Sequence, residues 1–208
     1  MKKIIKVSLV ILASLSINLN LFSQEKFNSY QNDLLKKTYD INISFDNENK
    51  FTLFIDATSF DKQYLAGGII LMQDKYKNFI TALNEAKIKY IEWIKTAQQN
   101  NVKSLNKDME YISKVSSYFG NENGDRWMFQ IDVYLKFNFM IKVVDNNVKY
   151  LLIVNTGELR DTKNDYLKST GLALIFSSVK EIDDFLSIIS MDKINSFISK
   201  PKKEELFK

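Results

Sequence analysis

Apolar and polar residues alternate along two stretches near the start of the chain, at residues 39–45 and 51–57. A period of two is typical of a strand with one buried face. The intervening residues 46–49 are Asp, Asn and Glu, which favour a turn. The two stretches therefore predict a β-hairpin, and a third apolar run at 69–72, led by glycine, predicts a further strand.

Apolar residues recur at spacings of three and four from residue 74 to residues 98–101. This spacing predicts a long amphipathic helix, with Asp74 as its N-cap. Ser178 and Glu181 match a capping box and predict the start of a second helix. A further helical turn is predicted over residues 194–198.

The most regular alternation predicts a strand over residues 129–143. Its apolar face contains Phe129, Ile131, Val133, Leu135, Phe137, Phe139, Ile141 and Val143. At ~3.3 Å per residue this strand would span ~50 Å, so we expect it to twist, bend or carry a bulge. The other predicted elements here are strands at 109–119, 148–155 and 171–176, and a polar loop at 157–168.

These elements predict an α+β fold in which antiparallel β meanders are each followed by a helix. We expect residues 24–37 to form a polar lead-in, helical around residues 30–35. Residues 38–199 are predicted to form a single α+β domain, and residues 200–208 a charged tail. Within the domain, the halves 38–101 and 108–199 share one order of hairpin, glycine-led strand and helix, which suggests a duplicated βββα unit.

The same element order resembles, in topology, the PUR-type repeat, in which a curved antiparallel sheet is followed by a helix. No residue motif carries this resemblance, so it implies no binding residues in this chain. It does imply a second alternative function, single-stranded nucleic-acid binding, if the protein is not exported.

Residues 1–23 have the layout of a secretory signal peptide: a short basic stretch, an apolar run and a small residue, Ser23. The alternative is a retained membrane anchor, but the strongly apolar part is shorter than the ~20 residues that span a bilayer. The chain has no Cys that could serve as a lipobox for lipid attachment. We therefore expect a periplasmic or secreted protein with no transmembrane helix after cleavage.

Composition excludes several classes of chemistry. The 208 residues include no His and no Cys, which excludes His- or Cys-based nucleophilic catalysis, zinc fingers and disulfides. The net charge is +4, and loss of residues 1–23 removes three Lys and no acidic residue, leaving +1. A near-neutral chain lacks the basic footprint that nucleic-acid binding requires.

Six residues are candidates for ligand or partner binding. Arg126 and Arg160 can grip a carboxylate in a bidentate fork, although an internal Asp or Glu could be the partner. Trp127 adjoins Arg126, Glu158 adjoins Arg160, and Tyr134 and Lys136 lie on the polar face of the long predicted strand, which could equally be its solvent face.

The remaining acid–base candidates are carboxylates: Asp56, Asp132, Glu158, Asp161 and Asp165. A carboxylate hydrolase needs two such groups held ~5–9.5 Å apart across a substrate. The segment from residue 119 has some features of a calcium loop, but Phe119 stands where an Asp is needed, so we reject it. No phosphate-binding glycine motif is present, and we expect no metal site and no cofactor.

These observations predict an exported, non-catalytic binding protein, and its size fits an inhibitor or immunity-type protein. The expected partner is a protein, peptide or glycan of the cell envelope. The alternative is a carboxylate-dependent hydrolase of the envelope.

Overall fold

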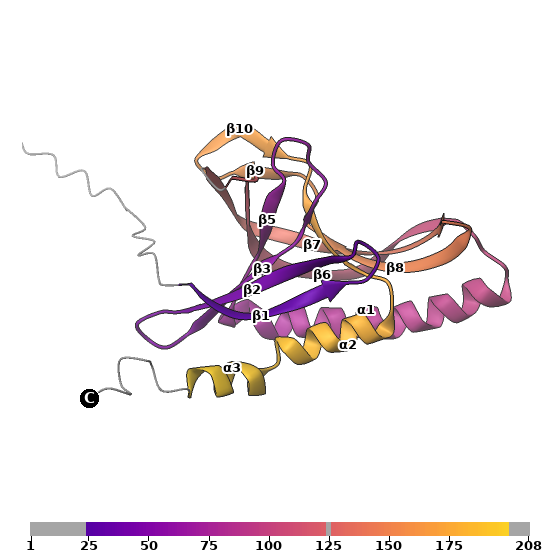
Figure 1. Cartoon of the computed structure of the whole chain (residues 1–208), viewed down its shortest axis with the longest axis horizontal. Helices are drawn as coiled ribbons and strands as arrows, with labels where there is room; N and C mark the ends of the chain where they lie inside the picture. Colours follow the sequence, from indigo (N-terminus) through magenta and orange to yellow (C-terminus); the bar gives the residue numbers. More distant parts are fainter. Residues whose placement is uncertain (1–23, 124–125, 200–208) are drawn as a thin grey trace, which may run out of the picture.

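The computed structural model describes residues 24–123 and 126–199, which form an α+β fold (Figure 1). The predicted signal peptide, residues 124 and 125 and the predicted charged tail lie outside the described residues. The elements are β1 (Glu25–Asn32), β2 (Lys37–Phe45), β3 (Phe51–Asp56), β4 (Thr58–Ser59), β5 (Ala66–Met72), α1 (Gln73–Gln99), β6 (Leu105–Gly120), β7 (Trp127–Val144), β8 (Asn147–Asn155), β9 (Leu159–Asp161), β10 (Asn164–Ser169), β11 (Leu172–Phe176), α2 (Val179–Ile188) and α3 (Met191–Ile198).

Nine strands form one antiparallel sheet in the order β1-β2-β3-β5-β6-β7-β8-β11-β4. The predicted meanders, each followed by a helix, are present, and the two halves join through the pairing of β5 with β6. The halves therefore share one continuous sheet. The duplication of a βββα unit stays a prediction.

The sheet closes on itself at one end. Ala57 extends the β3–β5 ladder by donating its N–H to the Gly67 carbonyl at 2.9 Å, and the chain then continues into β4. Because β4 pairs with β11, strands β4, β5, β6, β7, β8 and β11 form a ring. A Cβ on Gly67 would lie 2.9 Å from the Leu172 side chain, so glycine lets β5 and β11 approach inside this ring.

The main hydrophobic core lies between the inner face of the curved sheet and helices α1 and α2. Alternate residues of the strands point into it, and α1 contributes its predicted apolar stripe, including Phe79, Leu83, Ala86 and Tyr90. Figure 1 shows α1 and α2 side by side along this face. The pattern of apolar residues thus correctly predicted the buried faces of most elements.

The long strand β7 carries the expected irregularity at Asp132, whose φ is 59°. The β6–β7 register shifts there, between Val115 and Ser117, so side chains exchange faces. Odd-numbered residues from Val133 to Ile141 are buried, as predicted. Before the bulge Phe129 and Ile131 are 38% and 62% exposed, and at the far end Val143 is 52% exposed, so placing these three on the buried face was wrong.

Two polar segments form strands that the apolar pattern did not predict. The helix expected around residues 30–35 is wrong, because residues 25–32 form β1 at the edge of the sheet. The polar loop at 157–168 contains β9 and most of β10. In both segments cross-strand hydrogen bonds hold the strand, so few apolar side chains are needed.

The first turn of α1 also differs from expectation. Strand β5 runs directly into the helix, and Met72 occupies the N-cap position without a side-chain hydrogen bond. Asp74 lies inside the first turn instead, where it pairs with Lys75 at 2.9 Å. Its negative charge still lies near the positive end of the helix dipole.

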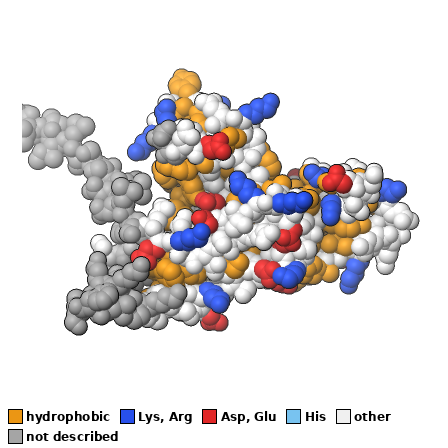
Figure 2. Space-filling model, in the orientation of Figure 1, with side chains coloured by type: hydrophobic (Ala, Val, Ile, Leu, Met, Phe, Trp, Pro, Cys, Tyr) orange, Lys and Arg blue, Asp and Glu red, His pale blue; other side chains and the backbone are white. Residues whose placement is uncertain are grey.

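Lys and Arg side chains lie among Asp and Glu over the face shown in Figure 2, without a continuous basic stripe. None of the helices formed by residues 24–123 and 126–199 is long and apolar enough to span a membrane. This finding concerns only that part of the chain.

Candidate functional site

The six predicted binding residues fall into separate places on the structure. Glu158 and Arg160 form an ion pair with each other, at 2.8 Å between Oε1 and Nη2. Arg160 also donates its backbone N–H to the Gln130 side chain at 2.6 Å, which ties β9 to the first part of β7. The internal partner of Arg160 is therefore Glu158, and both side chains are about half exposed, at 52% and 53%.

Trp127 is 43% exposed at the start of β7, and Arg126 beside it is exposed. The indole ring lies over Gly120 and contacts Tyr118 edge-on at 5.5 Å between ring centroids. Beyond the bulge Tyr134 is 57% exposed, and Lys114 lies over its ring at 5.7 Å.

Lys136, the last of the six, is also exposed on β7. None of the six predicted residues lines the groove between β1 and α2 or the shallow cavity between α1 and β6.

Among the candidate carboxylates, Asp56 has the most perturbed environment. It accepts a hydrogen bond from the Tyr118 hydroxyl, yet burial raises the pKa of the Asp56 carboxyl above its usual value of 3.8. Asp132 forms an ion pair with Lys114 at 3.0 Å, and Asp161 accepts the Phe129 N–H. Within the described residues, no group of three or more acidic side chains is arranged to hold a metal ion.

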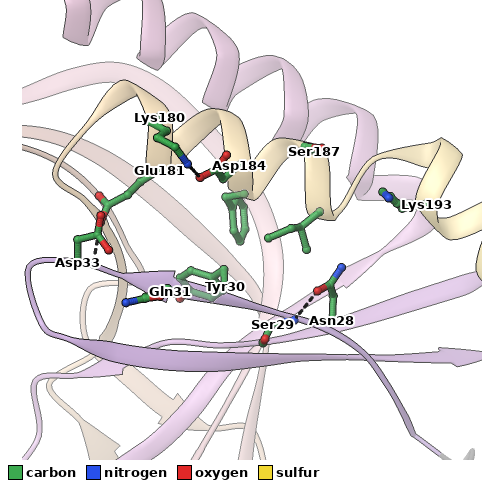
Figure 3. A pocket seen from close by; sticks show the side chains of 12 residues that line it. Asn28, Ser29, Tyr30, Gln31, Asp33, Lys180, Glu181, Asp184, Ser187 and Lys193 are labelled. Atoms are coloured by element: carbon green, nitrogen blue, oxygen red, sulfur yellow. Dashed lines mark hydrogen bonds and ion pairs between the residues drawn. The ribbon is translucent and has the colours of Figure 1, made fainter.

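A groove of about 460 Å³ lies between the edge strand β1 and helix α2, and α3 contributes Lys193 (Figure 3). The sequence did not predict this site. Residues 24–37 looked like a lead-in because β1 is mostly polar, with Tyr30 as its only deeply buried aromatic residue. The signal available in the sequence was therefore two aromatic residues, Phe27 and Tyr30, whose rings pack against the core from an otherwise polar segment.

The floor of the groove is built from aromatic rings. Tyr30 stacks on Tyr39 at 5.2 Å and meets Phe185 of α2 edge-on at 5.1 Å. Its hydroxyl donates to the Asp56 carbonyl at 2.9 Å. Burial, with smaller effects of Tyr39 and Asp56, raises the pKa of Tyr30 well above its usual value of 10.0, so the hydroxyl stays a neutral donor.

One edge of β1 faces this groove, because β1 is the first strand in the order of the sheet. Ser29 donates its backbone N–H to the Asn28 side chain at 2.9 Å, and Asp33 donates its N–H to Glu181 at 2.7 Å. In an antiparallel ladder alternate residues direct their backbone groups to the same edge. Gln31, midway between Ser29 and Asp33, therefore directs its N–H and C=O to the open edge.

Glu181 fixes the spacing between β1 and α2. Its side chain is 7% exposed, and its Oε2 accepts the backbone N–H of Ser177, while Ser178 accepts the Glu181 N–H at 3.1 Å. The predicted capping bond from the Glu181 N–H to Ser178 is confirmed. The return bond from the backbone to the Glu181 carboxylate comes from Ser177 rather than from Ser178. The second carboxylate oxygen accepts from Asp33, so one side chain caps α2 and anchors the end of β1.

The groove thus offers backbone hydrogen-bonding groups on one wall and charged side chains of α2 on the other. Lys180 and Asp184 of that wall form an ion pair one helical turn apart. This arrangement is suited to binding an extended polar ligand. A comparison with protein-family models, with curated proteins and with solved structures found no match to this chain.

Proposed function

We propose that this protein is an exported, non-catalytic binding protein that takes an extended segment of another polypeptide into the β1–α2 groove. The observation that carries the proposal is the open edge of β1, which faces a groove of about 460 Å³. Extended peptides commonly add as a further strand to such an edge, and main-chain hydrogen bonds supply much of their affinity.

The dimensions of the groove support a short peptide ligand. Its β1 wall runs from Asn28 to Asp33, and this distance is about 17 Å at ~3.3 Å per residue. A segment of about five residues would match it. The Gln31 N–H and C=O and the Ser29 C=O are the backbone groups available to it, since the Ser29 and Asp33 N–H groups already have acceptors.

A polypeptide ligand suits this site better than the other expected partners. A strand edge presents donors and acceptors at the repeat of another strand, whereas a glycan has no matching repeat. Nucleic acid would need a basic surface, and the groove contains both acidic and basic side chains. The hydrolase alternative would need two free carboxylates facing each other across a cavity. Of the three carboxylates that line the groove, Glu181 accepts backbone N–H groups and Asp184 pairs with Lys180, which leaves Asp33 alone.

Export is part of the proposal and rests on the pattern of residues 1–23. Fractionation of the host cell, with N-terminal sequencing of the protein from each fraction, tests it. We expect the protein in the periplasmic or secreted fraction, beginning near residue 24. A cytoplasmic protein that retains its first residues would overturn the export part.

Peptide binding is tested with a random peptide library selected on the purified protein lacking residues 1–23. The informative variant is Gln31→Pro, which removes the N–H at the open edge but no bond between β1 and β2. Gln31→Ala is the matched control, because it shortens the side chain and keeps the N–H. Circular dichroism checks that both variants fold.

Selected peptides should bind Gln31→Ala within about threefold of the wild type and Gln31→Pro at least about tenfold more weakly, as expected for one lost hydrogen bond. Equal binding by the wild type and the Pro variant would contradict strand addition at β1. A library that yields no binding peptide would contradict the peptide ligand itself.

A further inference from the structure

The charges at the two ends of the β1–α2 groove differ in sign. Asp33 lies at the C-terminal end of β1, and Lys193 of α3 lies at the opposite end of the groove (Figure 3). Both residues are exposed, and neither forms an ion pair with another described residue. Two side chains of opposite charge are therefore available to a ligand at opposite ends.

The other charges of the groove strengthen the acidic end. Glu181 lies beside Asp33, with its carboxylate engaged by backbone N–H groups. Lys180 is paired with Asp184 of the same helix, and it also lies close enough to Asp33 to interact with it electrostatically. The acidic end thus includes three carboxylates and one lysine, whereas Lys193 supplies the charge of the basic end.

A strand added antiparallel to β1 would run from the Asp33 end to the Lys193 end. Every pairing within the nine-stranded sheet is antiparallel, and antiparallel pairs are slightly more stable per residue. The N-terminal end of the ligand would then lie near Asp33 and its C-terminal end near Lys193. Residues four positions apart in a strand share one face, so both end residues of the ligand can point to the same side of the sheet.

We propose that the groove selects an antiparallel peptide with a basic residue at its N-terminal end and an acidic residue four positions later, recognised by Asp33 and Lys193. This inference rests on the proposed function, because it assumes strand addition at β1. It adds the direction and the end charges of the ligand.

The test compares two capped peptides, acetyl-Lys-Thr-Val-Thr-Glu-amide and acetyl-Glu-Thr-Val-Thr-Lys-amide, which have the same composition and no terminal charges. Binding is followed by NMR titration of the Gln31 amide, at low salt and again at high salt. We expect the first peptide to bind about tenfold more tightly at low salt, since two exposed ion pairs are replaced by two like-charge contacts. High salt should reduce this difference.

A double variant, Asp33→Lys with Lys193→Glu, should reverse the preference, and Asp192→Ala, a neighbouring exposed acidic residue of α3, should leave it unchanged. Equal binding of both peptides, with the Gln31 amide shifted, overturns the selection by charge and leaves peptide binding intact. A preference for the second peptide overturns the antiparallel direction. No shift of the Gln31 amide with either peptide overturns the inference and counts against strand addition itself.

Discussion

The Glu181 carboxylate stabilises the contact between α2 and β1, and its removal should have a large effect for one side chain. It accepts the backbone N–H groups of Asp33 and Ser177 and the Ser177 hydroxyl. Hydrogen bonds to a charged group contribute about 1.5–3 kcal/mol each when buried. Because the donors are partly accessible to water, we expect Glu181→Ala to lower the free energy of unfolding by about 3 kcal/mol.

Glu181→Gln keeps the size of the side chain but replaces one acceptor oxygen with a donor. One of the two backbone N–H groups then faces an amide NH2, so we expect a loss of about 1.5 kcal/mol. The matched control is Asp184→Ala, three residues further along α2, which removes only an exposed pair with Lys180. That pair should be worth at most about 0.5 kcal/mol.

Urea denaturation followed by far-UV circular dichroism measures all three variants. With a urea dependence of about 2 kcal/mol/M, Glu181→Ala should move the midpoint down by about 1.5 M. If Glu181→Ala lowers the free energy of unfolding by less than about 1 kcal/mol, the Glu181 carboxylate does not hold α2 against β1. The same conclusion follows if Asp184→Ala lowers it as much as Glu181→Ala does.

Three further changes test other parts of the structure. Asn32 is 1% exposed and donates its side-chain N–H to the Ile175 carbonyl, in the part of β11 that β4 does not cover. Asn32→Ala should therefore lower the free energy of unfolding by about 2 kcal/mol, measured by urea denaturation. An unchanged urea midpoint would contradict this contact. A Cβ on Gly68 would clash with the Ile55 carbonyl and lie 2.5 Å from the Tyr118 hydroxyl, so Gly68→Ala should lower the free energy of unfolding by at least about 2 kcal/mol. Gly157→Ala meets no neighbouring atom but places a side chain at a φ of 64°, so it should cost only the backbone strain of about 1 kcal/mol, and an equal loss for both variants would contradict the clash. For Asp56, the folded carboxyl has the higher pKa, so the wild type should lose stability relative to Asp56→Asn as pH rises from about 3.8 through the folded pKa. Parallel curves of unfolding free energy against pH for the two proteins would contradict the raised pKa.

The apolar pattern predicted the elements whose buried faces are decided locally. The hairpin of β2 and β3, the helix α1 and the central part of β7 each bury their predicted faces. The position of the bulge in β7 was not predictable. Asp132 adopts a positive φ at the point where β7 bends, and there the strand next to β7 changes from β8 to β9. That change depends on segments far from residue 132 in the sequence.

The candidate site was less predictable than the fold. The residues singled out from the sequence were notable for their chemical type, such as Arg160, whose guanidinium pairs with Glu158 of the same segment. The proposed ligand contact is instead the backbone of Gln31, and a backbone group has no signature in a sequence. The groove also needs Asp33 and Glu181 in contact, although they lie 148 residues apart.

By itself, the sequence determined the α+β class, the buried faces of the main strands and helices, and the capping of α2. It also excluded His- and Cys-based chemistry through composition alone. Periodicity and capping act over a few residues, so they can be read along the chain. The tertiary structure decided that β1 is a strand, that β4 closes the sheet on β11, and that the open edge of β1 faces α2. These features depend on hydrogen bonds and packing between distant segments, which the local pattern does not record.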